Sequence, residues 1–204
     1  GIYNIGHTVN NNGNIISGMS AVGIYNDKGI INSSGNISSD TDGLGIYSTG
    51  GESNLTGGKI SGKDLGIYAL NNTKIENTGA EMSIGDNGKG YVLFSGSNLD
   101  STQNATIGAG GVYVYGDNAG DVVNNGSSVM LSGPGSIGFY MTNSGNISNK
   151  ADITGLSAGN IGIYSDKGNI NNSGNITLGD SEIIDQNDSA KNKYAVGIYG
   201  EGAE

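Results

Sequence analysis

Histidine and cysteine, two residue types that often carry out catalysis, are nearly absent from this 204-residue chain. His7 is the single histidine, and there is no cysteine. A Ser–His–Asp triad would have to use His7, but no Gly-x-Ser-x-Gly or Gly-Asp-Ser-Gly nucleophile motif accompanies it. One histidine and no thiolate also exclude a zinc site built from several such ligands. We therefore interpret His7 as a surface residue.

Carboxylates are the remaining source of acid–base chemistry, with 19 Asp and Glu in the chain. Glycoside hydrolysis requires two of them at about 5–10 Å from each other. Most of the acids, such as Asp27, Asp40 and Asp86, fall in segments with the composition of turns. The chain has no arginine to bind a uronate, and it lacks the Asn-Thr-Asp, Asp-Asp and Gly-His-Gly elements of polygalacturonases. We predict no catalytic residues and no enzyme activity.

One acidic segment offers oxygen ligands of the kind that Ca²⁺ binds. It spans residues 179–193, and its candidate ligands are Asp180, Glu182, Asp185 and Asp188. The segment lacks the spacing of an EF-hand, so a solvated acidic loop is the main interpretation and a calcium site the weaker one. We expect no cofactor and no other metal.

A short phrase, Gly-Ile-Tyr or a close variant, returns nine times along the chain. A fixed period in the low twenties indicates a solenoid. The phrase starts at Gly1, Gly23, Gly45, Gly66, Gly90, Gly111, Gly138, Gly162 and Gly197.

Each repeat divides into three short strands that are separated by Asn-, Ser- and Gly-rich turns. We predict an all-β fold, a right-handed parallel β-helix of about eight coils of 21–24 residues with three strands per coil. Eight coils give a rod of roughly 40 Å. Alternation at period two predicts that Val22 and Ile24 of one strand face the core, and that Gly23 and Tyr25 face outward.

Two further columns of aliphatic residues are predicted to fill the core, because parallel strands with an interior face are rich in Ile, Val and Leu. The second strand contributes Val9, Ile31, Leu55, Ile75, Leu99, Val122, Ile147 and Ile170. The third contributes Ile15, Ile37, Ile60, Ile84, Ile107, Val129, Ile153 and Ile176.

The tyrosines of the phrase are the most suggestive surface feature. Tyrosine suits sugar or protein partners because it offers a large amphipathic area with few torsions to restrict. The alternative is structural, since stacked rings stabilise neighbouring strands by about 0.2–1 kcal/mol per pair. The candidate ligand-binding residues are Tyr3, Tyr25, Tyr47, Tyr68, Tyr113, Tyr140, Tyr164 and Tyr199.

The composition restricts the class of partner. A formal charge of −10 opposes binding to nucleic acid or to an anionic membrane surface. We expect residues 1–204 to form one β-helix segment with the acidic loop inserted at 179–193. Because both ends of the sequence lie within or beside a repeat, we expect a piece of a longer protein. Its unpaired terminal strands predict end-to-end self-association.

Glycine-rich, cysteine-free repeats that follow the pattern x-Gly-Ile-Tyr-x-x-x-Gly-x-Ile-x-Asn-x-Gly-x-Ile-x resemble the passenger domains of autotransporters, the type V secreted proteins of Gram-negative bacteria. More narrowly, they resemble the large autotransporter adhesins of oral anaerobes. The resemblance covers essentially the whole chain. It implies a stalk displayed at the outer membrane, and attachment to a protein or glycan on host cells or other bacteria.

The sequence thus favours a non-enzymatic adhesin segment that presents or spaces a binding surface at the cell surface. Two alternatives stay open, namely a polysaccharide lyase or hydrolase on the same fold and a pure spacer without a ligand.

Overall fold

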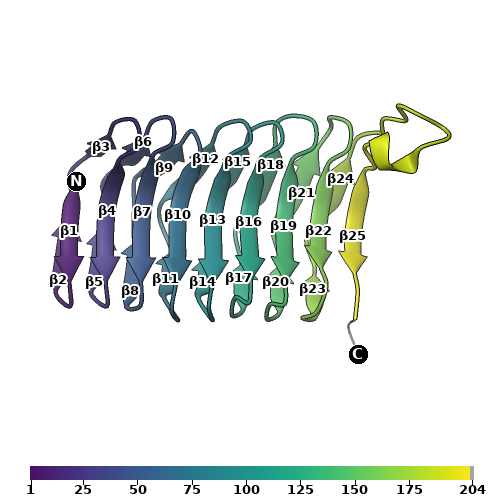
Figure 1. The fold of residues 1–204 in the computed structure, drawn as a ribbon. Helices are drawn as coiled ribbons and strands as arrows, with labels where there is room; N and C mark the ends of the chain where they lie inside the picture. The colour runs from purple at the N-terminus through teal and green to yellow at the C-terminus, as the bar shows by residue number, and fades with distance from the viewer. Residues whose placement is uncertain (203–204) are drawn as a thin grey trace.

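The computed structural model describes residues 1–202 as a parallel β-helix (Figure 1). Ala203 and Glu204, the last two residues of the predicted segment, lie outside the described residues. The backbone winds through about eight coils, and each coil gives one strand to each of three parallel sheets. The predicted fold class and the three strands per coil are confirmed.

Sheet A contains the strands of the repeated phrase and runs the full length of the rod. Its strands are β1 (Ile2–Ile5), β4 (Val22–Asp27), β7 (Leu44–Thr49), β10 (Leu65–Leu70), β13 (Lys89–Phe94), β16 (Val112–Asp117), β19 (Ile137–Thr142), β22 (Ile161–Ser165) and β25 (Val196–Gly200).

Sheets B and C contain the second and third strands of each coil. Sheet B is β2 (Thr8–Asn11), β5 (Ile30–Ser33), β8 (Glu52–Leu55), β11 (Lys74–Asn77), β14 (Asn98–Ser101), β17 (Val122–Asn124), β20 (Ile147–Asn149) and β23 (Ile170–Asn172). Sheet C is β3 (Ile15–Ser17), β6 (Ile37–Ser39), β9 (Lys59–Gly62), β12 (Glu81–Ile84), β15 (Ala105–Ile107), β18 (Ser128–Leu131), β21 (Asp152–Gly155) and β24 (Ile176–Leu178).

Sheet A departs from simple alternation at its glycines. In β4 both Gly23 and Ile24 are buried, whereas Val22 is 40% exposed. A Cβ added to Gly23 would point at the core residues Ile15 and Ile37 and lie 2.6 Å from the carbonyl oxygen of Gly45. The predicted inward position of Val22 and outward position of Gly23 are therefore wrong. Two consecutive residues face inward, and at Gly23 only glycine leaves room for the neighbouring coil.

The aliphatic columns run inward as predicted, but their register differs in places. Leu55 pairs with Ser33 and Asn77, while Ser53 stands beside Ile31 and Ile75. In sheet C, Met82 and Ala105 continue the column of Ile60, whereas Ile84 and Ile107 lie two residues further along. A shift of two residues keeps a side chain on the same face, so all of these residues remain in the core.

Polar ladders also run inside the rod. Asn4 donates to Asn26 at 2.8 Å, and Asn26 donates to Ser48 at 3.1 Å, each across one coil. On sheet B, Asn124 donates to Asn149 at 2.9 Å and Asn149 to Asn172 at 2.7 Å. These amides satisfy one another, as buried polar groups must, and they fix the alignment of successive coils.

The inserted loop follows β24 at the C-terminal end of the rod, where it projects from the last coil (Figure 1). It holds the short 3-10 helix η1 (Ser189–Lys191) and an antiparallel bridge between Glu182 and Lys193. Within residues 1–202, no helix has the length and apolarity needed to cross a membrane.

Candidate functional site

The outer face of sheet A carries a continuous ladder of aromatic rings, which we call the aromatic ladder. Ring centroids of successive members lie 4.7 Å apart at the closest, for Tyr140 and Tyr164, and 6.1 Å apart at the widest, for Phe94 and Tyr115. Its members are Tyr3, Tyr25, Tyr47, Tyr68, Phe94, Tyr115, Tyr140, Tyr164 and Tyr199. The structure therefore brings together seven of the eight predicted tyrosines.

Tyr113 is the exception, and its predicted place in the ladder is wrong. It is 1% exposed and packs edge-on between Tyr91 and Phe139 in the core, at centroid distances of 5.6 and 5.5 Å. Tyr113 occupies the column of the inward glycines, because the carbonyl oxygen facing Gly90 belongs to Tyr113. The ladder position in that coil belongs to Tyr115, which pairs with Tyr140.

The sequence held a signal for this correction. A phrase starting at Gly111 gives adjacent repeat steps of 21 and 27 residues, whereas a start at Tyr113 gives 23 and 25. Phe94 was also missed. It stands two residues after Val92, the residue in register with Tyr68, and so reaches the ladder from the next outward position.

Stacking determines which part of each ring is available to a partner. Most neighbouring rings are nearly parallel, such as Tyr47 and Tyr68 at an interplanar angle of 5°. An interior tyrosine stacked on both neighbours, such as Tyr25, Tyr47, Tyr140 or Tyr164, is therefore covered on both faces, and its edge and hydroxyl remain for a partner. Partial burial between neighbours raises the pKa of Tyr25, and the Asp27 carboxylate raises it further. A sugar ring that stacks on an aromatic face finds no free face on these doubly stacked tyrosines.

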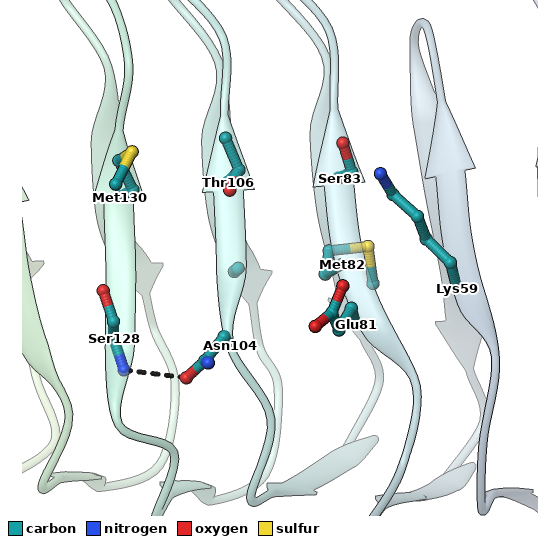
Figure 2. A pocket seen from close by; sticks show the side chains of 9 residues that line it. Lys59, Glu81, Met82, Ser83, Asn104, Thr106, Ser128 and Met130 are labelled. Atoms are coloured by element: carbon teal, nitrogen blue, oxygen red, sulfur yellow. Dashed lines mark hydrogen bonds between the residues drawn. The ribbon is translucent and has the colours of Figure 1, made fainter.

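A second surface lies on the outer face of sheet C, where four successive coils form a hollow of about 430 Å³ (Figure 2). Long side chains stand at its two ends, Lys59 on β9 and Met130 on β18. Between them the outward side chains of Ser83 and Thr106 are short and Met82 is buried, which leaves the surface depressed there. The hollow is lined by Lys59, Glu81, Met82, Ser83, Asn104, Ala105, Thr106, Ser128 and Met130.

The polar groups of this hollow are largely free. Within residues 1–202, no hydrogen bond or ion pair engages the Lys59 ammonium, the Glu81 carboxylate or the hydroxyls of Ser83, Thr106 and Ser128. The Asn104 carbonyl oxygen accepts the Ser128 backbone N–H at 3.0 Å, which leaves its NH₂ group as a free donor. Sequence reasoning missed these residues because Ser, Thr and Asn are common throughout the chain.

The carboxylates of the acidic loop pair mainly with lysines of the same loop. Lys191 lies 3.1 Å from Asp185 and 3.4 Å from Asp188, and Lys193 lies 2.9 Å from Glu182. The Asn187 backbone N–H and the Lys191 ammonium hold the pKa of Asp185 below its usual value. Across the described part of the chain, no three His, Cys, Asp or Glu residues are grouped so as to hold a metal ion, and this includes the four candidates.

One pair of carboxylates does stand in register on neighbouring coils. Glu76 on β11 pairs with Asp100 on β14, on the outer face of sheet B. Glu76 also lies 3.4 Å from Lys74, and neither acid lines either of the two hollows on sheet C. His7 is exposed in the bend between β1 and β2, far along the chain from these acids.

Comparisons with protein-family models, with curated proteins and with solved structures return no match for this chain.

Proposed function

We propose that this chain is a segment of a bacterial cell-surface attachment protein, a β-helical rod that presents or spaces a binding surface. The observation that carries the proposal is repetition of surface chemistry along a rigid rod. Sheet A repeats an aromatic edge in each coil, and sheet C repeats a hydroxyl. A repeated surface supports several weak contacts at once, which raises avidity without any new kind of contact.

Rigidity supports the same role. The eight complete coils are hydrogen-bonded to one another through three sheets, and the internal amide ladders add side-chain bonds between coils. A rod with these links keeps a binding surface at a fixed distance from whatever anchors it. We place it on the bacterial outer surface, where a partner would be a protein or glycan of a host cell or of another bacterium.

A polysaccharide-active enzyme is the alternative that the register of Glu76 and Asp100 favours. The two acids stand on adjacent coils, as the paired carboxylates of a glycosidase would. Incubation with pectic and host polysaccharides tests it through new reducing ends or unsaturated sugars. Glu76→Gln should abolish any such activity, whereas Asp152→Asn on sheet C should leave it unchanged.

Attachment itself is tested in two assays. An in-frame deletion of this segment should lower adhesion to host cells or partner bacteria, and restoring the segment should recover it. Beads coated with the 204-residue chain should bind the same cells. Normal adhesion by the deletion strain would rule out the attachment role. Reduced adhesion by the deletion strain, together with coated beads that bind no cells, would assign the segment to spacing rather than binding.

A further inference from the structure

The outer face of sheet C carries two polar columns that run parallel to the rod axis. One is a column of hydroxyls in register across coils, interrupted by Met130: Ser38, Ser61, Ser83, Thr106, Thr154 and Thr177. The column beside it carries charges and amides, including the register neighbours Lys59 and Glu81. Groups that donate or accept hydrogen bonds are therefore repeated along the rod at the strand spacing of about 4.8 Å.

The hollow lies where most polar side chains of these two columns have no hydrogen-bond partner within residues 1–202. Its residues lie on β9, β12, β15 and β18 or, for Asn104, directly before β15, so it extends over three strand spacings, about 14 Å along the rod. A smaller hollow of about 290 Å³ shares Met130 and continues to β21. That continuation is apolar at its surface, with Met130 50% and Leu156 71% exposed.

The chemistry of these groups restricts the ligand. The Lys59 ammonium and the Asn104 amide donate, the Glu81 carboxylate accepts, and the Ser83 and Thr106 hydroxyls do both. A ligand rich in hydroxyls matches such a surface along its whole length. An added peptide strand has no place here, because the sheet C strands in the hollow are already paired on both sides. One positive and one negative side chain cancel within the hollow, and the chain's net charge of −10 opposes an anionic ligand.

We propose that the outer face of sheet C binds a linear, uncharged oligosaccharide that lies along the rod axis. Successive sugars hydrogen-bond to Lys59, Glu81, Ser83, Asn104 and Thr106, and the apolar face of a further sugar contacts Met130 and Leu156. This inference rests on the proposed attachment function and identifies its ligand. It also places the ligand on the outer face of sheet C, which has free hydrogen-bonding groups, and not on the aromatic ladder.

Binding is tested with the 204-residue chain on an array of neutral, uronate-containing and sialylated oligosaccharides of two to six sugars. Host-type and bacterial-type glycans in separate arms distinguish the source. We expect binding to neutral chains, with an affinity that rises up to about three or four sugars because the hollow spans four coils. No binding to any neutral glycan, or binding to charged glycans alone, would overturn the proposal.

Variants connect binding to this face. Ser83→Ala and Thr106→Val remove outward hydroxyls without adding bulk, and together they should weaken the best neutral ligand at least tenfold in calorimetry. Ser148→Ala removes an outward hydroxyl on sheet B and should leave the affinity unchanged. Unchanged circular dichroism and unfolding midpoints confirm that the variants are folded. Equal affinities for the double variant and the Ser148 control would refute the site.

The two proposals fail separately. If the segment binds no glycan but its deletion still lowers adhesion, the attachment role stands and the oligosaccharide site does not. If the hollow binds a glycan but the deletion strain adheres normally, the site stands and the attachment role does not.

Discussion

At the scale of single residues, the inward glycines of sheet A decide how closely the coils approach. A Cβ at Gly66 would lie 2.6 Å from the carbonyl oxygen of Gly90 and 3.0 Å from the sulfur of Met82. The backbone oxygen belongs to a hydrogen-bonded strand, so it has little freedom to move. At Gly66, as at Gly23, glycine is thus required by the close packing of neighbouring strands.

Gly66→Ala should therefore lower the free energy of unfolding by about 1–3 kcal/mol, the usual cost of overpacking. Gly13→Ala is the matched control, since a Cβ there meets nothing within 4 Å and its φ is not in the left-handed region. Urea unfolding of both variants measures the difference. Equal midpoints for the two variants would contradict the inward placement of Gly66.

The buried tyrosines predict a loss of stability at high pH. Burial raises the pKa of Tyr91 from the ordinary value of 10.0 to about 12, and burial raises the pKa of Tyr113 as well. As the pH rises from 10 toward 12, the unfolded chain releases the Tyr91 proton while the folded chain keeps it. The folded state binds more protons in that window, so stability is complete below pH 10 and falls above it.

Unfolding free energies at pH 9 and pH 11 measure this effect. Tyr91→Phe should reduce the fall but not remove it, because Tyr113 remains. The variant should also be less stable at pH 9, since Asn77 loses the hydroxyl to which it donates at 2.8 Å. An alkaline slope identical to that of the unmodified chain would show that Tyr91 does not titrate as proposed.

At the scale of elements, two adjacent residues in a strand of sheet A have different roles. One packs in the core, and the next stacks on the outer surface. Ile67 is fully buried, whereas Tyr68 lies outside and stacks on Tyr47 and Phe94, each at 5.5 Å. Ile67→Ala should cost about 2–5 kcal/mol because it leaves a cavity. Tyr68→Ala should cost about 0.2–1 kcal/mol for each of its two lost contacts. Thermal unfolding compares them, and equal losses would contradict the assignment of inside and outside.

Strand-level prediction from the sequence succeeded where period two holds and failed where it is broken. The inward Ile columns of sheets B and C follow simple alternation, so even residues placed two positions out of register, such as Leu55 and Ile84, were assigned to the correct face. Alternation fails at Gly23 and Ile24, which face inward in succession. The positions of Val22 and Gly23 were inverted for that reason.

The candidate site was less predictable than the fold. Tyr113 and Tyr115 both occupy plausible ladder positions two residues apart, and only the packing of Tyr113 against Tyr91 and Phe139 decides between them. The hollow on sheet C depends on the lengths of side chains that come from four different coils. No local motif reports that arrangement, because the residues are separated by about one repeat each.

At the scale of the whole molecule, stability is distributed over coils that contact mainly their neighbours. Removing residues 23–44 joins Val22 to Gly45, and the register partners Val22 and Leu44 make this a clean excision of one coil. The shortened chain should fold into a rod about 4.8 Å shorter, measured by small-angle X-ray scattering. Removing residues 23–33, half a coil, should prevent folding. If the chain that lacks half a coil still folds, the complete coil is not the unit of structure.

The placement of Tyr113 also affects which changes in repeat number the protein tolerates during evolution. In that coil a large ring fills the column that glycine occupies elsewhere, while Gly116 vacates the next inward column and Met141 lies against it. This coil thus combines one large and one small inward side chain, and Met141 of the next coil lies against the small one. Recombination that splits such a combination disrupts its packing, whereas unequal crossover between equivalent points of two repeats preserves it. Natural variants of this protein should therefore differ in length by whole repeats.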